Sequence, residues 1–172
     1  MCWDDGAEYM KTIPLTRGQE AIVDDSDFEW LNQWIWKALV SSCGHGYYAV
    51  RRCRAAETRT TGAQCVLMHR QILGLVHGDV RQADHINGDR LDNRRVNLRI
   101  ATPAQNQANT GLPAHNSSGF KGVSIARSSR WKAQLSVNNR NVVIGTFDTP
   151  EEAYAAYCSA IIKYRGEFAR LG

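Results

Sequence analysis

Residues 84–106 read Asp-His-Ile-Asn-Gly-Asp-Arg-Leu-Asp-Asn-Arg-Arg-Val-Asn-Leu-Arg-Ile-Ala-Thr-Pro-Ala-Gln-Asn. An acid stands directly beside a histidine, and an Asn-Gly-Asp turn follows at residues 87–89. This pattern predicts two short strands, at residues 80–86 and 97–100, on either side of the turn. Thr102-Pro103 then predicts the start of a helix, because a hydroxyl N-cap precedes a proline at the first helical position.

The side chains of this stretch suggest chemistry on a phosphodiester. Its spacing can bring a carboxylate, an imidazole and an amide oxygen around one hard metal ion, from Asp84, His85 and Asn106. Four arginines available for a phosphate backbone lie in the same stretch: Arg90, Arg94, Arg95 and Arg99. Candidate metal ligands, a candidate base and arginines that can bind phosphates together indicate a nuclease.

The same residues resemble a known motif. Residues 84–89, 91–94 (Leu-Asp-Asn-Arg) and 97–99 (Asn-Leu-Arg) are similar to the HNH nuclease motif, or ββα-metal finger, over roughly residues 65–110. The version in phage and intron-encoded homing endonucleases is the most similar, and it often ends in asparagine, here Asn106, rather than in a second histidine. The resemblance implies that Asp84 and Asn106 hold a divalent metal and that Asn97 ties the loop to the strand bearing His85.

His85 has a reference pKa of about 6.5, so it can act as a neutral general base near pH 7. An all-oxygen ligand pair fits Mg²⁺ best and Mn²⁺ next, ahead of Zn²⁺. In the same region, Asp89, Asp92 and Asn93 are interpreted as turn formers. For His69, which precedes the motif, packing or a phosphate contact is favoured over catalysis.

A different unit follows the motif. The Gly, Pro, Asn and Ser content of residues 111–117 is typical of a linker. Strands are expected at residues 120–126, 131–137 and 141–147. A helix over residues 151–164 is expected after Thr149-Pro150, with acids in its first turn, an amphipathic face and Gly166 at its end.

This second segment also resembles a known domain. Ser-Gly-Phe-Lys-Gly-Val at 118–123, Gly-Thr-Phe-Asp-Thr at 145–149 and Glu-Glu-Ala-Tyr-Ala-Ala-Tyr at 151–157 are similar to the APETALA2 (ethylene-response-factor) DNA-binding domain, over about residues 117–172. The resemblance implies a sheet laid in the major groove of DNA. Lys132 and Gln134 would share one face of their strand, and Trp131 and Ala133 the other. The residues it nominates for DNA binding are Lys121, Arg127, Arg130, Trp131, Lys132, Gln134 and Arg140.

The first third of the chain predicts a small β-rich region. Strands are expected within residues 13–23, broken by a turn at 16–18, and at 47–53, with a short helix after Asp24. Three tryptophans, Trp30, Trp34 and Trp36, are expected to pack in a core. Residues 55–63 are polar and threonine-rich, so we expect a loop or hairpin tip there, followed by a strand at 65–68 and a short helix at 69–74.

The fold class is therefore α+β. It comprises an N-terminal β-rich region (1–64), a ββα-metal motif (65–110), a linker (111–117), and a three-stranded antiparallel sheet packed on one helix (118–172). At 172 residues none of these parts has a large core.

Charge and composition narrow the class of protein. Residues 1–30 carry two basic and eight acidic residues, whereas residues 31–115 carry a net +6 and residues 116–172 a net +4. This positive clustering favours a nucleic-acid partner. Five cysteines without a Cys-x-x-Cys pair argue against a disulfide framework and a thiolate zinc site. No long apolar stretch or signal peptide is evident, so we expect a cytosolic protein without a membrane partner.

These observations predict a metal-dependent, homing-type DNA endonuclease that nicks double-stranded DNA, with no obligatory protein partner evident. The alternative from a different class is a DNA-binding regulatory or architectural protein with an inert nuclease centre.

Overall fold

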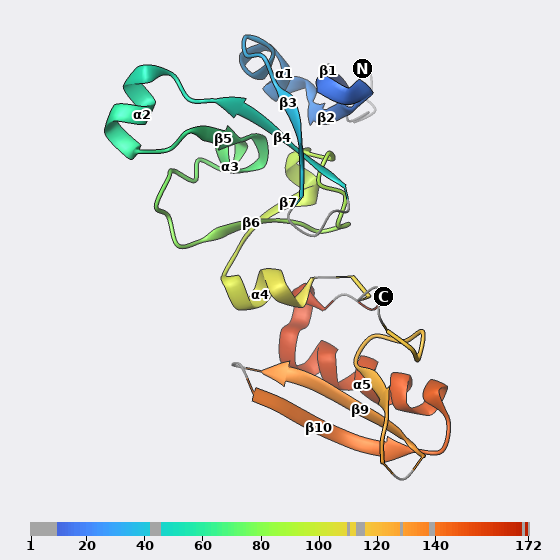
Figure 1. Ribbon diagram of the computed structural model, residues 1–172. Helices are drawn as coiled ribbons and strands as arrows, with labels where there is room; N and C mark the ends of the chain where they lie inside the picture. Colours follow the sequence, from blue (N-terminus) through green and yellow to red (C-terminus); the bar gives the residue numbers. More distant parts are fainter. Residues whose placement is uncertain are drawn as a thin grey trace, which may run out of the picture. The chain divides into compact units, whose positions relative to one another are not determined.

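The computed structural model describes residues 10–41, 46–109, 111–112, 116–127, 129–137, 140–169 and 171. The chain divides into two compact units, residues 1–102 and residues 103–172. Each unit combines short antiparallel strands with helices, which confirms the expected α+β class (Figure 1). Cys2, Cys43 and Gly44 lie outside the described residues.

The first unit begins with a hairpin. Strand β1 (Met10–Pro14) pairs antiparallel with β2 (Glu20–Asp24) around the 3-10 turn η1 (Thr16–Gly18). The predicted strands and turn are therefore confirmed. Helix α1 (Asp25–Asn32) follows, with Asp25 and Asp27 in its first turn, where the helix dipole favours acids.

A three-stranded sheet with the order β3-β4-β5 forms the middle of this unit. Its strands are β3 (Lys37–Val40), β4 (Tyr47–Arg52) and β5 (Cys65–Leu67), and helix α3 (Met68–Ile72) follows directly. Strand β4, strand β5 and helix α3 were expected. Strand β3 was not, since its four residues carry little pattern of their own and are held by pairing with β4.

The expectation of a loop at residues 55–63 is wrong, because α2 (Ala55–Thr61) is a helix. Glu57 explains it. Its Oε2 accepts a hydrogen bond from the backbone N of Arg54 at 2.6 Å, and its carboxylate pairs with the buried Arg51 at 2.7 Å. Gly62, with φ of +72°, ends the helix. Capping and a tertiary ion pair thus override the weak helix propensity of the threonines.

The last elements of the first unit are the hairpin β6 (Gln82–His85) and β7 (Leu98–Ala101), with the 3-10 turn η2 (Arg95–Asn97) just before β7. Both strands of the motif are confirmed, with β6 starting two residues later than expected. The motif is joined to the N-terminal hairpin by a parallel bridge between Ile22 and Asp92. The backbone N of Ile22 donates to the Leu91 carbonyl, and that of Asn93 to the Ile22 carbonyl, both at 2.8 Å.

One hydrophobic cluster unites these parts of the first unit. It contains residues of the hairpin, α1, the three-stranded sheet, α3 and β7, among them Ile13, Leu31, Met68 and Leu98. Trp36 is buried in it, and Trp30 and Trp34 pack against it, so the expected tryptophan packing is confirmed. The N-terminal region and the motif therefore share a core.

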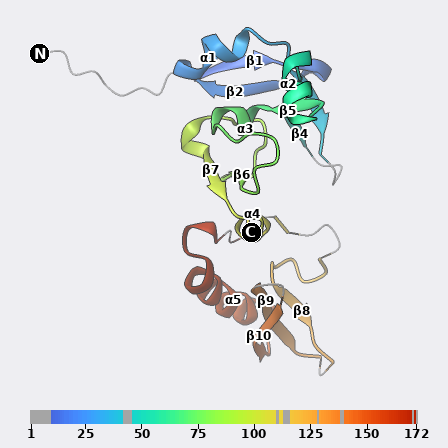
Figure 2. The same ribbon diagram turned by 90° about the vertical axis from the view of Figure 1, so that its left-hand side faces the viewer.

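The second unit begins with helix α4 (Pro103–Ala108) and contains the sheet β10-β9-β8. Its strands are β8 (Val123–Ile125), β9 (Trp131–Val137) and β10 (Arg140–Phe147), all antiparallel. Helix α5 (Pro150–Arg165) runs along one face of this sheet and is followed by the 3-10 turn η3 (Gly166–Phe168) (Figures 1 and 2). The expected three strands and helix are confirmed.

Packing explains why α5 lies on this sheet. Ala133 and Leu135 of β9 face Ala153, Tyr157 and Ile161 of α5 in one buried cluster. Gly122 is required beneath it, since its φ is +74° and an added Cβ would lie 2.2 Å from the Tyr157 ring. The helix starts at a capping box: Thr149 Oγ1 accepts from the backbone N of Glu152 at 3.2 Å.

Among the described residues, no helix is long and apolar enough to cross a membrane. The described cysteines, Cys53, Cys65 and Cys158, are free thiols.

Candidate active site in the HNH segment

Asp84 and His85 are the last two residues of β6, and both are buried, with 4% and 5% of their surface exposed. Neighbours on a strand point to opposite faces, and their contacts differ accordingly. Oδ2 of Asp84 accepts a hydrogen bond from Nε of Arg99 on β7 at 2.8 Å. The His85 ring instead packs against His69 and Tyr48.

Asn97 joins the loop of residues 87–92 to the strand bearing His85. Its Oδ1 accepts from the backbone N of Asn87 at 2.9 Å, and its Nδ2 donates to the Asp92 carbonyl at 2.8 Å. Its own carbonyl accepts from the backbone N of Ile86 at 2.9 Å. Asn97 is 6% exposed, so these bonds are formed away from solvent, where they hold the loop firmly.

Asn93 was expected only to form a turn, but its side chain also contacts His85. It is fully buried, and its Oδ1 lies 3.5 Å from Nε2 of His85. Its Nδ2 donates to the Leu91 carbonyl at 3.0 Å, which orients the amide oxygen toward the histidine. Sequence reasoning assigned Asn93 only to the turn, because nothing in the local pattern shows that this amide faces the imidazole.

Burial lowers the pKa of His85 from its ordinary value, and the contact with Asn93 and the charges of Asp84, Asp89 and Asp92 oppose that effect only in part. The imidazole is therefore neutral at pH 7 and can accept a proton.

The arginines of the motif differ in their surroundings. Arg94 binds both carboxylate oxygens of Asp92, at 2.8 and 2.7 Å, and Arg95 binds both of Asp27, at 2.7 and 2.8 Å. Arg90 lies over the Tyr48 ring, with its Cζ 5.3 Å from the ring centroid. Arg94 and Arg99 thus bind carboxylates within the motif, whereas Arg95 joins the motif to α1.

The second unit contains the other predicted site residues. Asn106 lies on α4 and is half-buried. Lys132 and Gln134 alternate along β9 with the buried Ala133, so they share the sheet face opposite α5, as expected. Trp131 instead packs against the hydrophobic cluster beneath α5.

The remaining DNA-binding candidates lie outside the buried core of the second unit. Arg127 and Arg140 are exposed, and Lys121 is half-buried. Arg130 is exposed and forms an ion pair with Asp148 at 2.8 Å.

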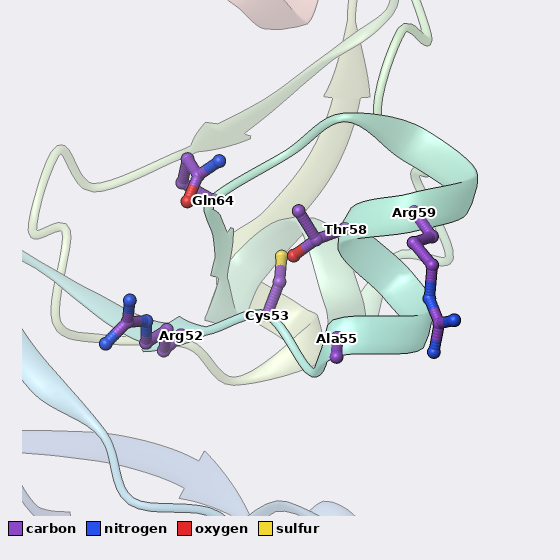
Figure 3. Close-up of a pocket in the computed structure, with 6 residues that line it drawn as sticks. All are labelled: Arg52, Cys53, Ala55, Thr58, Arg59 and Gln64. Carbon is purple, nitrogen blue, oxygen red and sulfur yellow. The ribbon is translucent and has the colours of Figure 1, made fainter.

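The surface of the first unit is hollowed beside the motif and around α2. One hollow, of about 450 Å³, borders the turn of the motif and is lined by residues that include Tyr47, Gly88 and Arg90. The other, of about 460 Å³, is formed around α2 by Arg52, Cys53, Ala55, Thr58, Arg59 and Gln64 (Figure 3). Both arginine side chains point away from the centre of the second hollow, which contains none of the predicted site residues.

Comparison with known proteins identifies the segment that carries this geometry. Residues 66–108 match the model of the HNH endonuclease family. This segment is thus similar to HNH endonucleases. An uncharacterized HNH endonuclease of Acanthamoeba polyphaga mimivirus is 35% identical over 98 residues, which is 57% of this chain and 50% of that protein. The chain thus spans about half the length of this relative.

Two further relatives are similar to parts of the chain. Protein 3.8 of Escherichia phage T7 is 28% identical over 106 residues, 59% of this chain and 87% of that protein. An AP2/ERF and B3 domain-containing transcription factor of Arabidopsis thaliana is 38% identical over 63 residues, 37% of this chain and 18% of that protein. No solved structure matches the chain at a comparable level of significance.

The buried His69, which packs against His85, predicts a loss of stability in acid. Burial, followed by the charges of His85 and Arg70, lowers the pKa of His69 from 6.5 to about 3. Between these values the unfolded chain binds a proton that the folded chain does not. The contribution of His69 to the free energy of unfolding is therefore fully present above pH 6.5, and it is lost as the pH decreases toward 3. At pH 5 the loss from this one group is about 2 kcal/mol.

Urea unfolding of the wild type and of His69→Phe at pH 7.5 and pH 5 measures this effect. The phenylalanine variant is expected to lose about 2 kcal/mol less than the wild type between the two pH values. An equal loss in both proteins would show that His69 does not cause the acid sensitivity.

Proposed function

We propose that this chain is a metal-dependent, homing-type DNA endonuclease that nicks one strand of double-stranded DNA at each engagement, with His85 as general base. The observation that carries the proposal is the buried Asp84-His85 pair at the end of β6, held by Asn97 within the HNH domain. One such centre cuts one strand, so a nick is the simplest product.

In the proposed reaction, His85 acts as the proton acceptor. Its neutral imidazole would take a proton from water, whose oxygen then forms the new bond to phosphorus while the bond to the 3′ oxygen breaks. The imidazolium formed in this step would be stabilised by Oδ1 of Asn93, 3.5 Å from Nε2, and by the carboxylates of Asp84, Asp89 and Asp92.

The HNH family implies a divalent metal, and the carboxylate of Asp84 is an oxygen donor of the kind that Mg²⁺ prefers. Within the residues that the structure describes, no three His, Cys, Asp or Glu side chains gather closely enough to hold a metal ion. The resemblance to the HNH motif nominates Asp84 and Asn106 as its ligands, and oxygen donors suit Mg²⁺ first and Mn²⁺ second. The hydrogen bond from Arg99 uses one lone pair on Oδ2 of Asp84. Because a carboxylate has about four lone-pair sites, other lone pairs can still bind a metal. The metal would supply positive charge at the scissile phosphate and the leaving oxygen.

We further propose that residues 118–172 are an APETALA2-like DNA-binding domain. Polar side chains on the sheet face opposite α5 support this role, and the exposed Val143 lies among them, opposite Gln134. Strand register aligns Lys132 with Thr146 and Ser136 with Asn141, and Gln134 lies between these two pairs on the same face. These side chains can contact phosphates and base edges, and the similarity to the AP2/ERF protein agrees with this role.

Plasmid nicking is the direct test of the endonuclease proposal. Purified wild-type protein is expected to convert supercoiled plasmid to open circles in Mg²⁺ and to leave it supercoiled in chelator. The absence of nicking under both conditions, with DNA binding retained, would contradict the proposal.

That outcome would support the second candidate, a DNA-binding regulatory or architectural protein with an inert nuclease centre. One observation favours this candidate: Asp84 already forms a buried ion pair with Arg99, whose side chain is 14% exposed. An arginine bound to the carboxylate competes with a metal for it.

The proposed role of the sheet predicts a change in salt dependence. Lys132→Ala removes one cation from the outer face, so the log–log slope of DNA affinity against salt should become shallower by about 0.9 if one phosphate contact is lost. Binding to one duplex across a salt series measures the slope.

Lys163→Ala is the matched control, since Lys163 is an exposed lysine of α5 in the same unit. It should keep the wild-type slope. Equal slopes for the wild type and Lys132→Ala would exclude Lys132 from phosphate binding.

A further inference from the structure

His69 lies directly behind the proposed base. Helix α3 places it in the interior, with 5% of its surface exposed. Its ring centroid is 4.9 Å from that of His85, and the two rings meet edge to face at 70°. Aromatic rings prefer this arrangement at this separation.

Tyr48 of β4 is the third ring of this cluster. Its ring centroid is 5.3 Å from that of His69 and 6.3 Å from that of His85. Arg90, from the loop after β6, lies over the Tyr48 ring. The His85 imidazole is therefore packed against rings from two other elements, α3 and β4.

Hydrogen bonding at Nδ1 does not explain why a histidine occupies position 69. Nδ1 of His69 is buried and has no hydrogen-bond partner among the residues that the structure describes. A buried polar atom without a partner destabilises a fold. The ring of His69 packs against the rings of His85 and Tyr48.

We propose that His69 is a positioning residue for the nuclease reaction: its ring holds the His85 imidazole in the orientation from which His85 takes the proton. This inference rests on the proposed role of His85 as base. Tight packing leaves few rotamers for His85, and a base displaced by about 1 Å can lose roughly a hundredfold in rate. Removing the neighbouring ring would free the imidazole to turn into the space left behind.

The first experiment compares nicking rates and DNA affinity in three variants. His69→Ala is expected to lower kcat by about 10- to 100-fold and to leave the dissociation constant for DNA unchanged, because it loosens the base without removing a phosphate contact. His69→Phe restores a ring and is expected to return kcat to within a few-fold of the wild type.

Ile72→Ala is the matched control. Ile72 lies three residues further along α3, is also 5% exposed, and packs in the hydrophobic cluster. Its truncation leaves a cavity in the same helix but removes no ring beside His85, so kcat should stay near the wild-type value at a temperature where all variants are folded. A similar loss of kcat in Ile72→Ala and His69→Ala, or no recovery in His69→Phe, would overturn the proposal.

A second experiment does not depend on activity. The Cε1–Hε1 resonance of His85 is expected to shift or broaden in His69→Ala and to stay at its wild-type position in Ile72→Ala. An unchanged resonance in His69→Ala overturns the positioning role even if the wild type nicks DNA. A wild type that does not nick, combined with a resonance that responds to His69→Ala, overturns the proposed function and supports the structural role of His69.

Discussion

Replacing His85 with alanine is expected to lower the rate of plasmid nicking by about 10²- to 10⁴-fold, the usual contribution of a general base. DNA affinity should stay close to that of the wild type, because contacts with phosphates carry the binding. The side chain is buried against His69 and Tyr48, so the variant needs a thermal unfolding measurement to establish that it is folded.

His77→Ala is the control for this experiment, since His77 is an exposed histidine in the same unit. It should nick at the wild-type rate. A folded His85→Ala protein that nicks like the wild type would exclude His85 as the base, and the reaction would then need a proton acceptor elsewhere.

Replacing Asp84 with alanine is expected to reduce nicking in Mg²⁺ to the level seen in chelator, because the variant lacks the carboxylate proposed to hold the metal. It also removes a negative charge from the proposed binding site of a polyanion, so DNA affinity should be unchanged or higher. Metal titrations of the nicking rate, together with binding measurements in chelator, separate the two effects.

Asp79→Ala is the matched control for Asp84→Ala. Asp79 also pairs with an arginine, Arg81, at 2.7 Å, but it lies outside β6. Its loss should leave the metal dependence unchanged. If Asp84→Ala retains Mg²⁺-dependent nicking, Asp84 is not a ligand and its bond to Arg99 is purely structural.

The local elements of the motif could be predicted from short windows of sequence. The Asn-Gly-Asp turn, the strands around it and the Thr102-Pro103 helix start depend on signals within a few residues, and the structure contains β6, β7 and α4 at these places. The same holds for the strands of the second unit and for α5, whose capping box lies within four residues.

Residues 55–63 show where local reasoning failed. Their polar, threonine-rich sequence has no apolar period, yet α2 forms because Glu57 caps it and pairs with Arg51 of β4. The cap could have been read from the sequence. The ion pair could not, since it depends on where β4 places the Arg51 guanidinium.

The arginines of the motif illustrate the same limit. Sequence alone indicated four cations beside a nuclease centre, and Arg95 instead binds Asp27, 68 residues earlier in the chain. That pairing follows from the bridge between Ile22 and Asp92, which brings the N-terminal hairpin to the motif. An ion pair between residues so far apart is a property of the packed unit.

The α+β class, the order of the strands and helices around the motif, and the candidate base and metal ligands could all be predicted from residue types and their spacing. Turns and helix caps depend on residues within a few positions of each other, so residue types at fixed spacing specify them. The chemistry of a side chain follows from its residue type alone. By contrast, long-range packing is what brings Asn93 and the rings of His69 and Tyr48 against His85. These contacts join α3, β4 and the loop after β6 to one imidazole, and they form only when a shared core brings those elements together.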